Sequence, residues 1–312
     1  MGIRELRTFL ALADTLNYQK ASERLGYAPS TLSHHIKTLE QELGVALFVK
    51  VGKQIQMTAE ASAFMDHARN LIVSYEAALA SVGTGSSEQE NISIGGCEST
   101  ICNGLIDLFA SFAESRSSIR LRQRTSANAQ VPEMIREKHA DVGIFYSMDT
   151  QRLQGLQDQC LFREPMRLVA ARDSSISGRE DAHFADLAGM EFAFPHDDCP
   201  CVLELQKKLE EHCVAHGQMQ YFGAASLVVE RLLRGQAVTI LPYSTAQRYR
   251  KIYGLDVIRL DEEDLWMNVR IVYRSFEGLT PGGRALVAHS QQYARKLIEN
   301  DPKHFLPPET TE

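Results

Sequence analysis

A set of hydrogen-bonding side chains marks one side of a short predicted helix near the N-terminus. The apolar positions of this helix recur at helical spacing and form one buried face, made of Leu32, Ile36, Leu39 and Leu43. The positions off that face carry hydroxyl, imidazole and ammonium groups, at Ser30, Thr31, Ser33, His34 and Lys37. Hydroxyl, imidazole and ammonium groups can all form hydrogen bonds, and Lys37 adds a positive charge. These side chains lie away from the buried face of the helix.

A second short helix and a tight turn precede this face. The preceding helix can run from about Gln19 to Leu25, and Gly26 can adopt the left-handed conformation that ends it. Pro29 is acceptable at the first position of the next helix, and Gly44 ends that helix. Two short helices joined by a tight turn form a helix-turn-helix, whose second helix lies in the major groove of DNA. The alternative is two ordinary packed helices, which any amphipathic pair with a glycine turn would resemble.

The flanking segments support the DNA-binding interpretation. Before the pair, a first amphipathic helix carries a stripe that can pack under it, made of Ile3, Leu6, Phe9, Leu10 and Ala13. After the pair, residues 45–57 predict a hairpin that turns near Gly52 and Lys53, with Lys50 and Lys53 near its tip. A basic hairpin at this place is a wing that can contact phosphate.

Length, composition and charge bound the class of protein. A chain of 312 residues predicts about two domains, and it contains no run of about 18 apolar residues that would predict a membrane span. Met1 leads into a charged amphipathic helix without an apolar signal core, so we expect a cytoplasmic protein. The net charge is −7, but residues 1–58 hold seven Lys or Arg against five acids, which gives +2 for this segment and −9 for the remainder. Because residues 1–58 carry only a small positive charge, a single copy of this DNA-binding head would bind phosphate weakly, and we expect a dimer that presents two heads.

Other site chemistries find little support. Six cysteines stand at positions 97, 102, 160, 199, 201 and 213, with spacings that match no zinc motif, so we expect free thiols. His34 and His35 are adjacent and point to different faces of a helix, which makes them a poor metal pair. We therefore expect no metal and no cofactor. The sequence has no G-x-S-x-G, no glycine-rich phosphate loop and no H-E-x-x-H, so we expect no enzyme.

Residues 59–82 predict one long helix, which Thr58 can cap. Its apolar positions are spaced by four and three residues in turn, as in a coiled coil, and are Phe64, Ala68, Leu71, Tyr75, Ala78 and Val82, broadened by Met65, Ile72 and Leu79. This seam predicts pairing with a second copy of the chain, whereas a helix packed on its own domain would show a similar stripe. Residues 83–90 are small and polar and predict a hinge.

Beyond the hinge, short apolar strands alternate with helices. Strands are expected at residues 92–96, 119–124, 142–145, 166–171, 192–194, 220–222, 238–241, 256–259 and 269–273, and the helices include 201–216, 227–234 and 281–298. This alternation predicts α/β layers with largely parallel sheets. Two clusters of strands indicate two lobes, and the last strand and helix return to the first. The chain would then cross between the lobes twice and leave a cleft between them.

Small hydroxyl side chains follow several of these strands, where ligands bind in open α/β sheets. Ser99 and Thr100 follow the first strand, Ser126 follows the second, and Ser226 follows the strand at 220–222. Hydroxyl and N–H groups that converge on one cleft suit a small, anionic organic ligand. Alternatively, Ser99, Ser126 and Ser226 are only helix N-caps, a role that serine favours.

Residues 3–299 resemble the LysR-type transcriptional regulators. The N-terminal match is specific and comprises Leu6-Arg7-Thr8-Phe9, Ala21-Ser22-Glu23-Arg24-Leu25, the run from Leu32 to Glu40, the run from Leu43 to Phe48, and Met57-Thr58. The C-terminal match is looser and comprises Ile94-Gly95, the run from Ala140 to Ile144, the run from Asp186 to Gly189 and the run from Gln236 to Pro242. The resemblance implies a winged helix-turn-helix, a dimerising linker helix and a two-lobed effector domain like that of periplasmic binding proteins. It also implies a homodimer or homotetramer that binds double-stranded promoter DNA, responds to a small-molecule effector and contacts RNA polymerase.

The resemblance assigns roles to single positions. It implies base contacts for Ser30, Thr31, Ser33 and His34, phosphate contacts for Lys20, Lys37, Lys50 and Lys53, and effector contacts for Ser99, Thr100, Ser126, Cys199, Cys201 and Ser226. Two departures bear on the operator sequence. Pro29 stands where the family commonly has Gln, and His34-His35 stand where it commonly has Arg-Gln. Pro29 lies on or beside the groove-facing surface, so we include it among the DNA-binding positions.

The predicted fold class is an α+β multidomain chain with a winged helix-turn-helix, a long linker helix and a two-lobed α/β domain. Its parts are the DNA-binding domain at 1–58, the linker helix at 59–82, the hinge at 83–90, effector lobe I at 91–163 and 268–299, effector lobe II at 164–267, and a tail at 300–312. The leading hypothesis is a sequence-specific transcriptional regulator controlled by a metabolite bound between the lobes.

Two other hypotheses remain open. One is a redox sensor on the same scaffold, because Cys199 and Cys201 lie at the start of a helix, where the dipole lowers a thiol pKa. Cys213 would lie about 18 Å from Cys201 along that helix, too far for a disulfide. The other is a two-lobed binding module or enzyme that does not act on DNA.

Overall fold

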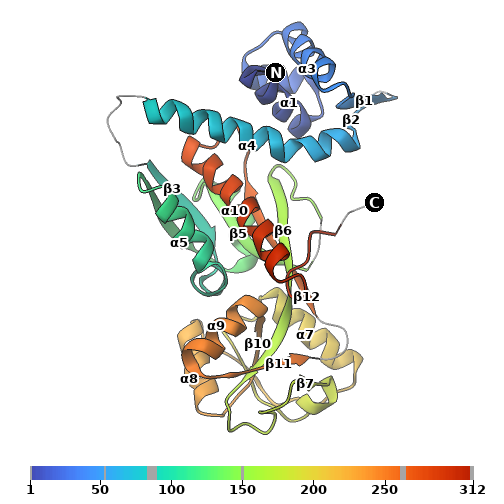
Figure 1. Cartoon of the computed structure of the whole chain (residues 1–312). Coiled ribbons are helices and arrows are strands. Elements are labelled where there is room, and N and C mark those ends of the chain that lie inside the picture. The colour runs from blue at the N-terminus through green and yellow to red at the C-terminus, as the bar shows by residue number, and fades with distance from the viewer. Residues whose placement is uncertain (1, 53, 83–89, 149–150, 261–264, 310–312) are drawn as a thin grey trace. The chain divides into compact units, whose positions relative to one another are not determined.

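The computed structural model describes residues 2–52, 54–82, 90–148, 151–260 and 265–309 (Figure 1). Its contacts divide the chain into two compact units, Met1–Glu90 with Arg274–His289, and Asn91–Tyr273 with Ser290–Glu312. The sequence had assigned residues 274–289 to effector lobe I. They cluster instead with the N-terminal unit, because Arg284 on helix α10 (Pro281–Asn300) donates to Glu76 on helix α4 (Ala59–Val82) at 2.6 Å.

Three helices and a hairpin make up the head of the first unit. The elements are α1 (Ile3–Thr15), α2 (Tyr18–Leu25), α3 (Pro29–Leu43), β1 (Phe48–Val51) and β2 (Gln54–Met57). The Asn17 side chain caps α2 by accepting a hydrogen bond from the Lys20 N–H. Gly26 and Gly44 end α2 and α3 with φ of 68° and 73°, a left-handed conformation that glycine adopts without a steric cost. The predicted ends of both helices and the place of Pro29 in the first turn of α3 are confirmed.

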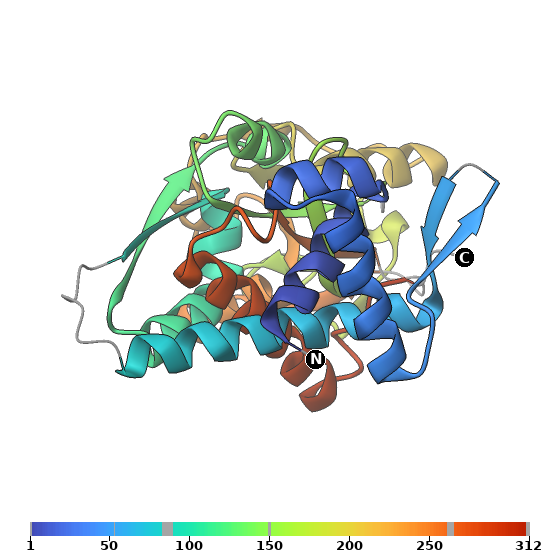
Figure 2. The same ribbon diagram turned by 90° about the horizontal axis from the view of Figure 1, so that it is seen from above.

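Aromatic packing joins the three helices to the hairpin. The Phe9 ring of α1 lies 5.8 Å from the Phe48 ring of β1 and 5.4 Å from the Phe64 ring of α4. Leu32, Ile36 and Leu39 of α3 are buried as predicted, whereas Leu43 is half-buried. Strands β1 and β2 pair from Phe48↔Met57 to Val51↔Gln54, which confirms the predicted hairpin. Figure 2 shows the hairpin extending from the helices of the head.

Helix α4 has one face inside its own unit and another face open. Thr58 caps the helix, since its hydroxyl accepts from the Ala61 N–H at 3.1 Å. Ala61, Ala68 and Ile72 are buried, whereas Leu71, Tyr75 and Leu79 are exposed by 41%, 43% and 53%. The predicted seam is therefore divided, because Phe64 and Ala68 pack into the head while Leu71 and Tyr75 remain open. The predicted hinge at 83–90 lies outside the described residues except for Glu90.

The second unit consists of two lobes. Lobe I contains β3 (Glu90–Gly96), the π-helical turn η1 (Ser99–Gly104), α5 (Ile106–Ser115), β4 (Ile119–Thr125), η2 (Asn128–Gln130), α6 (Val131–Arg136) and β5 (Val142–Ser147). Lobe II contains β7 (Asp181–Ala182), η3 (Phe184–Leu187), β8 (Phe192–Phe194), α7 (Pro200–Glu211), β9 (Met219–Tyr221), α8 (Ala225–Leu233), β10 (Thr239–Pro242), α9 (Tyr243–Tyr253) and β11 (Asp256–Leu260). Strands β6 (Gln157–Ala170) and β12 (Trp266–Tyr273) join the lobes, which confirms the two predicted crossings.

The sheets are mixed, so the prediction of largely parallel sheets is wrong. Strand β12 pairs antiparallel with β5 and β6, and β10 and β11 pair antiparallel with β6. Parallel pairing is found between β3 and β5, β11 and β7, and β8 and β9. The physical reason is that the chain enters lobe II on β6 and returns on its neighbour β12, so the two strands run in opposite directions. Helix α7 also ends at Glu211, before the predicted residue 216.

A buried ion pair joins the two crossing strands inside lobe I. Arg270 of β12 pairs with Asp158 of β6, and their side chains are exposed by only 3% and 7%. The same guanidinium donates to the backbone oxygen of Gln151 at 2.7 Å and lies over the Phe145 ring. The charge of Arg270 is therefore held inside lobe I by one carboxylate and nearby acceptors.

Asp158→Ala should destabilise the second unit strongly. Removing one partner of a buried pair leaves the other charge unpaired, which costs about 3–5 kcal/mol. Denaturant unfolding of the full chain measures the change. Glu133→Ala is the control, because Glu133 pairs with Arg136 at the surface of the same lobe and should matter little. Equal effects of the two substitutions would contradict this role for Asp158.

Candidate functional site

Helix α3 has two faces with different tasks. Pro29, Ser30, Thr31, His34 and Lys37 are exposed and Ser33 is half-buried, opposite the buried stripe of Leu32, Ile36 and Leu39. Lys20 on α2 and Lys50 on β1 are also exposed, and Lys53 lies outside the described residues. The predicted DNA-binding side chains that the structure describes therefore reach the surface of one small domain.

The neighbouring histidines serve different faces, as predicted. His34 is exposed, whereas the Nδ1 atom of His35 lies 2.9 Å from the Thr8 hydroxyl of α1. The His35 ring also meets the Tyr27 ring edge-on, at 5.3 Å between centroids. His35 thus fastens α3 to the rest of the head, and His34 remains available to a partner.

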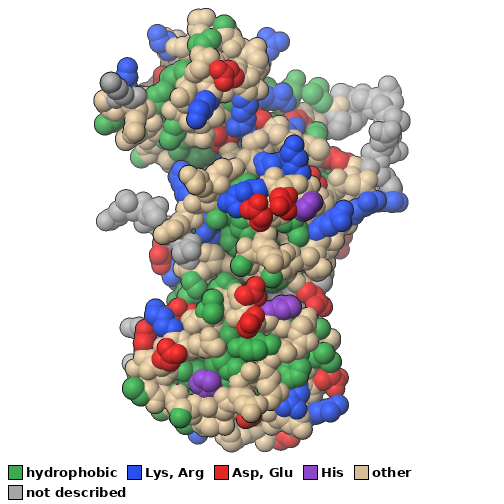
Figure 3. Space-filling view, turned by 180° about the vertical axis from the view of Figure 1, so that it is seen from behind, with side chains coloured by type: hydrophobic (Ala, Val, Ile, Leu, Met, Phe, Trp, Pro, Cys, Tyr) green, Lys and Arg blue, Asp and Glu red, His purple; other side chains and the backbone are tan. Residues whose placement is uncertain are grey.

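A carboxylate holds the wing against the end of α3. Glu40 accepts hydrogen bonds from the N–H groups of Leu47 at 2.7 Å and Phe48 at 3.2 Å. These bonds fix the chain where it enters β1 and so position Lys50. The space-filling view shows Lys and Arg side chains interspersed with acidic, apolar and other side chains on the face in view (Figure 3). Contact with a polyanion would therefore depend on a few placed cations rather than on overall charge.

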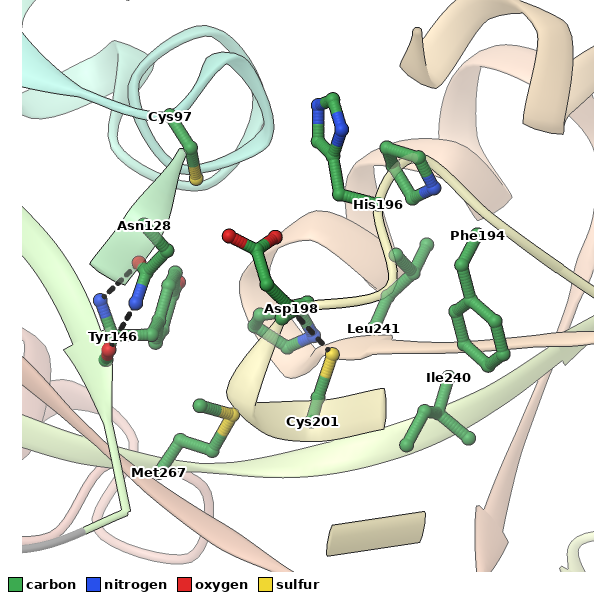
Figure 4. Close-up of a pocket in the computed structure, with 13 residues that line it drawn as sticks. Cys97, Asn128, Tyr146, Phe194, His196, Asp198, Cys201, Ile240, Leu241 and Met267 are labelled. Carbon is green, nitrogen blue, oxygen red and sulfur yellow. Dashed lines mark hydrogen bonds between the residues drawn. The ribbon is translucent and has the colours of Figure 1, made fainter. Parts of the chain in front are cut away.

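The second unit contains a pocket between its two lobes, at the place that the sequence predicted. Lobe I contributes Cys97, Asn128 and Tyr146, and β12 contributes Met267. Lobe II contributes the segment from Phe194 to Cys201 and the end of β10, through Phe194, Pro195, His196, Asp198, Cys199, Cys201, Ile240, Leu241 and Pro242. Figure 4 shows Cys97 and Asn128 on one side of this pocket and Cys201, Leu241 and Phe194 on another.

A second hollow adjoins this pocket and shares Cys97, Pro195 and His196 with it. The first pocket offers a water-sized molecule about 50 Å³, the room of one or two waters, whereas the second offers about 300 Å³. The second hollow reaches the volume of known small-molecule sites. Its lining adds Glu98, Thr125, Ser126, Ala127, Gly223 and Ala225.

Only some of the predicted effector residues line the two hollows. Cys199 and Cys201 line the first pocket and Ser126 lines the second. Thr100 is fully buried and its hydroxyl lies 2.7 Å from the Cys97 sulfur, so it supports the wall instead of lining it. Ser226 is exposed in the first turn of α8 and lines neither hollow, and the N-cap residue of that helix is Ala224. The side chain of Ser99 lies outside the described part of the chain.

Several lining residues were not predicted. Tyr146 stands near the carboxyl end of β5 and could have been found by the rule that ligands bind at strand ends. Asn128 could not have been predicted, because it lies in a short turn and is placed by two hydrogen bonds with the Tyr146 backbone, at 2.5 and 2.9 Å. Met267 could not have been predicted either, since its position depends on the pairing of β12 with β6.

A buried carboxyl group stands behind the pocket wall. Glu164 of β6 has no exposed surface and accepts hydrogen bonds from the Tyr146 hydroxyl at 2.6 Å and the Ser244 N–H at 2.7 Å. Ser244 lies in the first turn of α9, so the three residues come from lobe I, a crossing strand and lobe II. Burial raises the pKa of Glu164, and the hydrogen bonds from Tyr146 and Ser244 partly oppose that rise.

Comparison with known proteins agrees with this division into a head and a two-lobed domain. Residues 3–62 match the family model of bacterial regulatory helix-turn-helix proteins of the lysR family, and residues 85–295 match the LysR substrate binding domain. A helix-turn-helix head followed by a two-lobed ligand-binding domain defines a ligand-controlled DNA-binding protein. The chain belongs to the LysR family of bacterial transcriptional regulators.

Individual relatives are distant. The regulator CitR of Bacillus subtilis is 23% identical over 305 residues, which covers 96% of this chain and 98% of CitR. Full-length CbnR, crystallised with its target DNA, is similar with a TM-score of 0.54 and 21% identity, covering 94% of this chain and 100% of that chain. A full-length OxyR variant from Pseudomonas aeruginosa is similar with a TM-score of 0.55 and 18% identity, covering 93% of this chain and 98% of that chain. At these identities the solved structures support the fold alone.

No helix within the described ranges is long and apolar enough to span a bilayer.

Glu164→Gln should change the pH dependence of stability. When the pKa of a carboxyl group is higher in the folded chain than in the unfolded chain, the free energy of unfolding falls as the pH rises from the unfolded pKa towards the folded pKa. Glutamine has no such titration, so the stability of the variant relative to the natural chain should rise as the pH increases above about 4, the unfolded value of the Glu pKa. Urea unfolding of both chains over a series of pH values from about 4 upwards measures the difference.

Glu164→Ala serves as the control for lost hydrogen bonding. It leaves buried donors without an acceptor, at about 1–3 kcal/mol each, and should be less stable at every pH. A Gln variant whose relative stability falls with rising pH would contradict the raised pKa.

Proposed function

We propose that α3 reads an operator in the major groove and that a small molecule bound between the lobes changes this binding. The observation that carries the first part is the division of α3 into a packed face and an exposed polar face. Ser30, Thr31, Ser33 and His34 would contact base edges, and Lys20, Lys37, Lys50 and Lys53 would contact phosphate. Pro29 would lie beside the groove-facing surface. Contact with RNA polymerase is an expectation from the family resemblance.

The lining of the two hollows bears on the class of effector. The first two hollows include Glu98, Asp198 and His196 but neither Lys nor Arg among their described lining residues, whereas a third hollow, which shares Asn128, Tyr146 and Asp198 with the first, adds Lys207 and Arg270. We propose a small organic molecule with an apolar part and a polar part, and its anionic character stays an expectation from the sequence. Its apolar part would face Ile240, Leu241 and Phe194, and its polar part would face Thr125 and Ser126.

The open face of α4 supports self-association. Leu71, Tyr75 and Leu79 are spaced by four residues, so they form one exposed apolar row along the helix. A solvent-exposed apolar row on a helix is a surface for a partner helix. We propose that a second copy of the chain covers it, because the weakly basic head needs a partner to bind an operator firmly.

Two substitutions in α3 should separate base reading from phosphate contact. The probe is a duplex selected by the natural chain from a random pool. Ser33→Ala with His34→Ala should weaken binding to this duplex by about 10-fold or more, and change binding to random duplexes little. Lys37→Ala should weaken binding to both and reduce the slope of log affinity against log salt by about 1. Fluorescence anisotropy at several salt concentrations measures both effects.

Lys251→Ala is the matched control, because it removes the same charge from an exposed position on α9. Unchanged affinity after the double substitution at Ser33 and His34 would place the base-reading surface elsewhere.

The joint substitution Leu71→Ser, Tyr75→Ser and Leu79→Ser should weaken self-association. A loss of about 3 kcal/mol of apolar burial would raise the dissociation constant of a dimer about 100-fold. Sedimentation velocity over a concentration series measures it. The matched control replaces Leu203, Leu227 and Ile252 by Ser, since these side chains are similarly exposed, by 55%, 49% and 52%. Equal association of the two variants would exclude this face of α4.

A further inference from the structure

Two thiols meet in the wall of the pocket between the lobes. The sulfur atoms of Cys199 and Cys201 lie 2.9 Å apart, and both residues line the pocket. Cys199 is half-buried, and Cys201 is 7% exposed. Cys199 is the residue before α7, and Cys201 lies in its first turn after Pro200. Residues two positions apart span at most about 7 Å, so their Cα atoms fall near the range that a disulfide requires.

The two sulfurs are near enough for a bond between them after a movement of less than about 1 Å, since a disulfide bond is about 2.05 Å long. Among the described residues, no group of three or more His, Cys, Asp or Glu side chains could hold a metal ion. The pair is therefore arranged for thiol chemistry.

The two thiols are unequal, which suits a stepwise reaction. The hydrogen bond from Cys201 lowers the pKa of the Cys199 thiol, and the N–H groups of Cys201 and Val202 at the start of α7 lower it further. The same hydrogen bond and burial raise the pKa of Cys201. Cys199 is therefore the more acidic of the two thiols, and Cys201 holds its proton more firmly. By contrast, burial raises the pKa of Cys160 to about 11, which leaves that thiol unreactive at neutral pH.

We propose that Cys199 and Cys201 form a reversible disulfide in the wall of the effector pocket when the chain meets a hydroperoxide. The Cys199 thiolate attacks the peroxide, forms a sulfenic acid and releases an alkoxide, which takes a proton to become the alcohol, or water when the oxidant is hydrogen peroxide. The Cys201 thiol then attacks the sulfenic sulfur, which forms the S–S bond and releases water. In total, two thiols are oxidised, one peroxide O–O bond is reduced, and a dithiol reverses the change.

The disulfide would alter the site that we propose for the effector. In the reduced state Cys199 can ionise in a wall that already carries Asp198. In the oxidised state it cannot, and the start of α7 is tied to the preceding segment. This regulatory consequence rests on the proposed function, whereas the chemistry at the two sulfurs does not.

The test treats the full chain with hydrogen peroxide, blocks remaining thiols with N-ethylmaleimide and maps peptides by mass spectrometry. Two of the six thiols should become unreactive, both in the peptide that holds Cys199 and Cys201, and dithiothreitol should restore them. Cys201→Ser should stop at a sulfenic acid on Cys199, which dimedone traps. Cys199→Ser should lose the reaction at this peptide.

Cys213→Ser is the matched control, since Cys213 is an exposed thiol, and it should leave the disulfide unchanged. The proposal is overturned if both thiols stay reactive while Cys213 is oxidised, or if the bond joins a different pair. The thiol and peptide measurements do not involve DNA. A chain that failed to bind any duplex would therefore refute the proposed function without affecting the test of the disulfide.

Discussion

The antiparallel pairing of β6 with β12 is the constraint on which the effector domain depends. These strands join the two lobes, and buried polar groups along them leave few alternative registers. Arg270 pairs with Asp158 in lobe I, and Glu164, opposite Met267, binds Tyr146 and Ser244. A shift of one residue would turn each of these charges to the other face of the sheet, where it would have no partner. The position of the pocket wall follows from this register.

In the head, the two faces of one helix have different roles. Helix α3 has to pack against α1 and α2 and still present side chains to a partner, and its two faces divide these tasks. His35 and Leu32 serve packing, and His34 and Ser33 remain on the other side. Glu40 extends the arrangement to the wing by binding the N–H groups of Leu47 and Phe48. Because the head carries few cations, their placement matters more than their number.

The pocket between the lobes combines two kinds of lining. One part is narrow, apolar and rich in sulfur, with Cys97, Cys199, Cys201 and Met267. The adjoining part is wider and carries the hydroxyls of Thr125 and Ser126. A ligand in the wider part would lie beside the cysteine pair, so ligand binding and thiol chemistry would share one wall. In this arrangement a change at either place affects both lobes, because the wall is built from each of them.

The sequence alone determined the local features of this protein. Gly26, Pro29, Gly44 and Thr58 set the ends of helices through backbone preferences that need no distant partner, and the apolar spacing identified the packed face of α3. The two clusters of strands indicated two lobes, and the family resemblance implied the same. Tertiary structure decided the rest. It turned the first half of the α4 seam inward and made the sheets mixed. It also moved Thr100 and Ser226 out of the pocket lining and brought in Asn128, Tyr146 and Met267. These outcomes depend on contacts between residues far apart in the chain, whose register and burial no local pattern encodes.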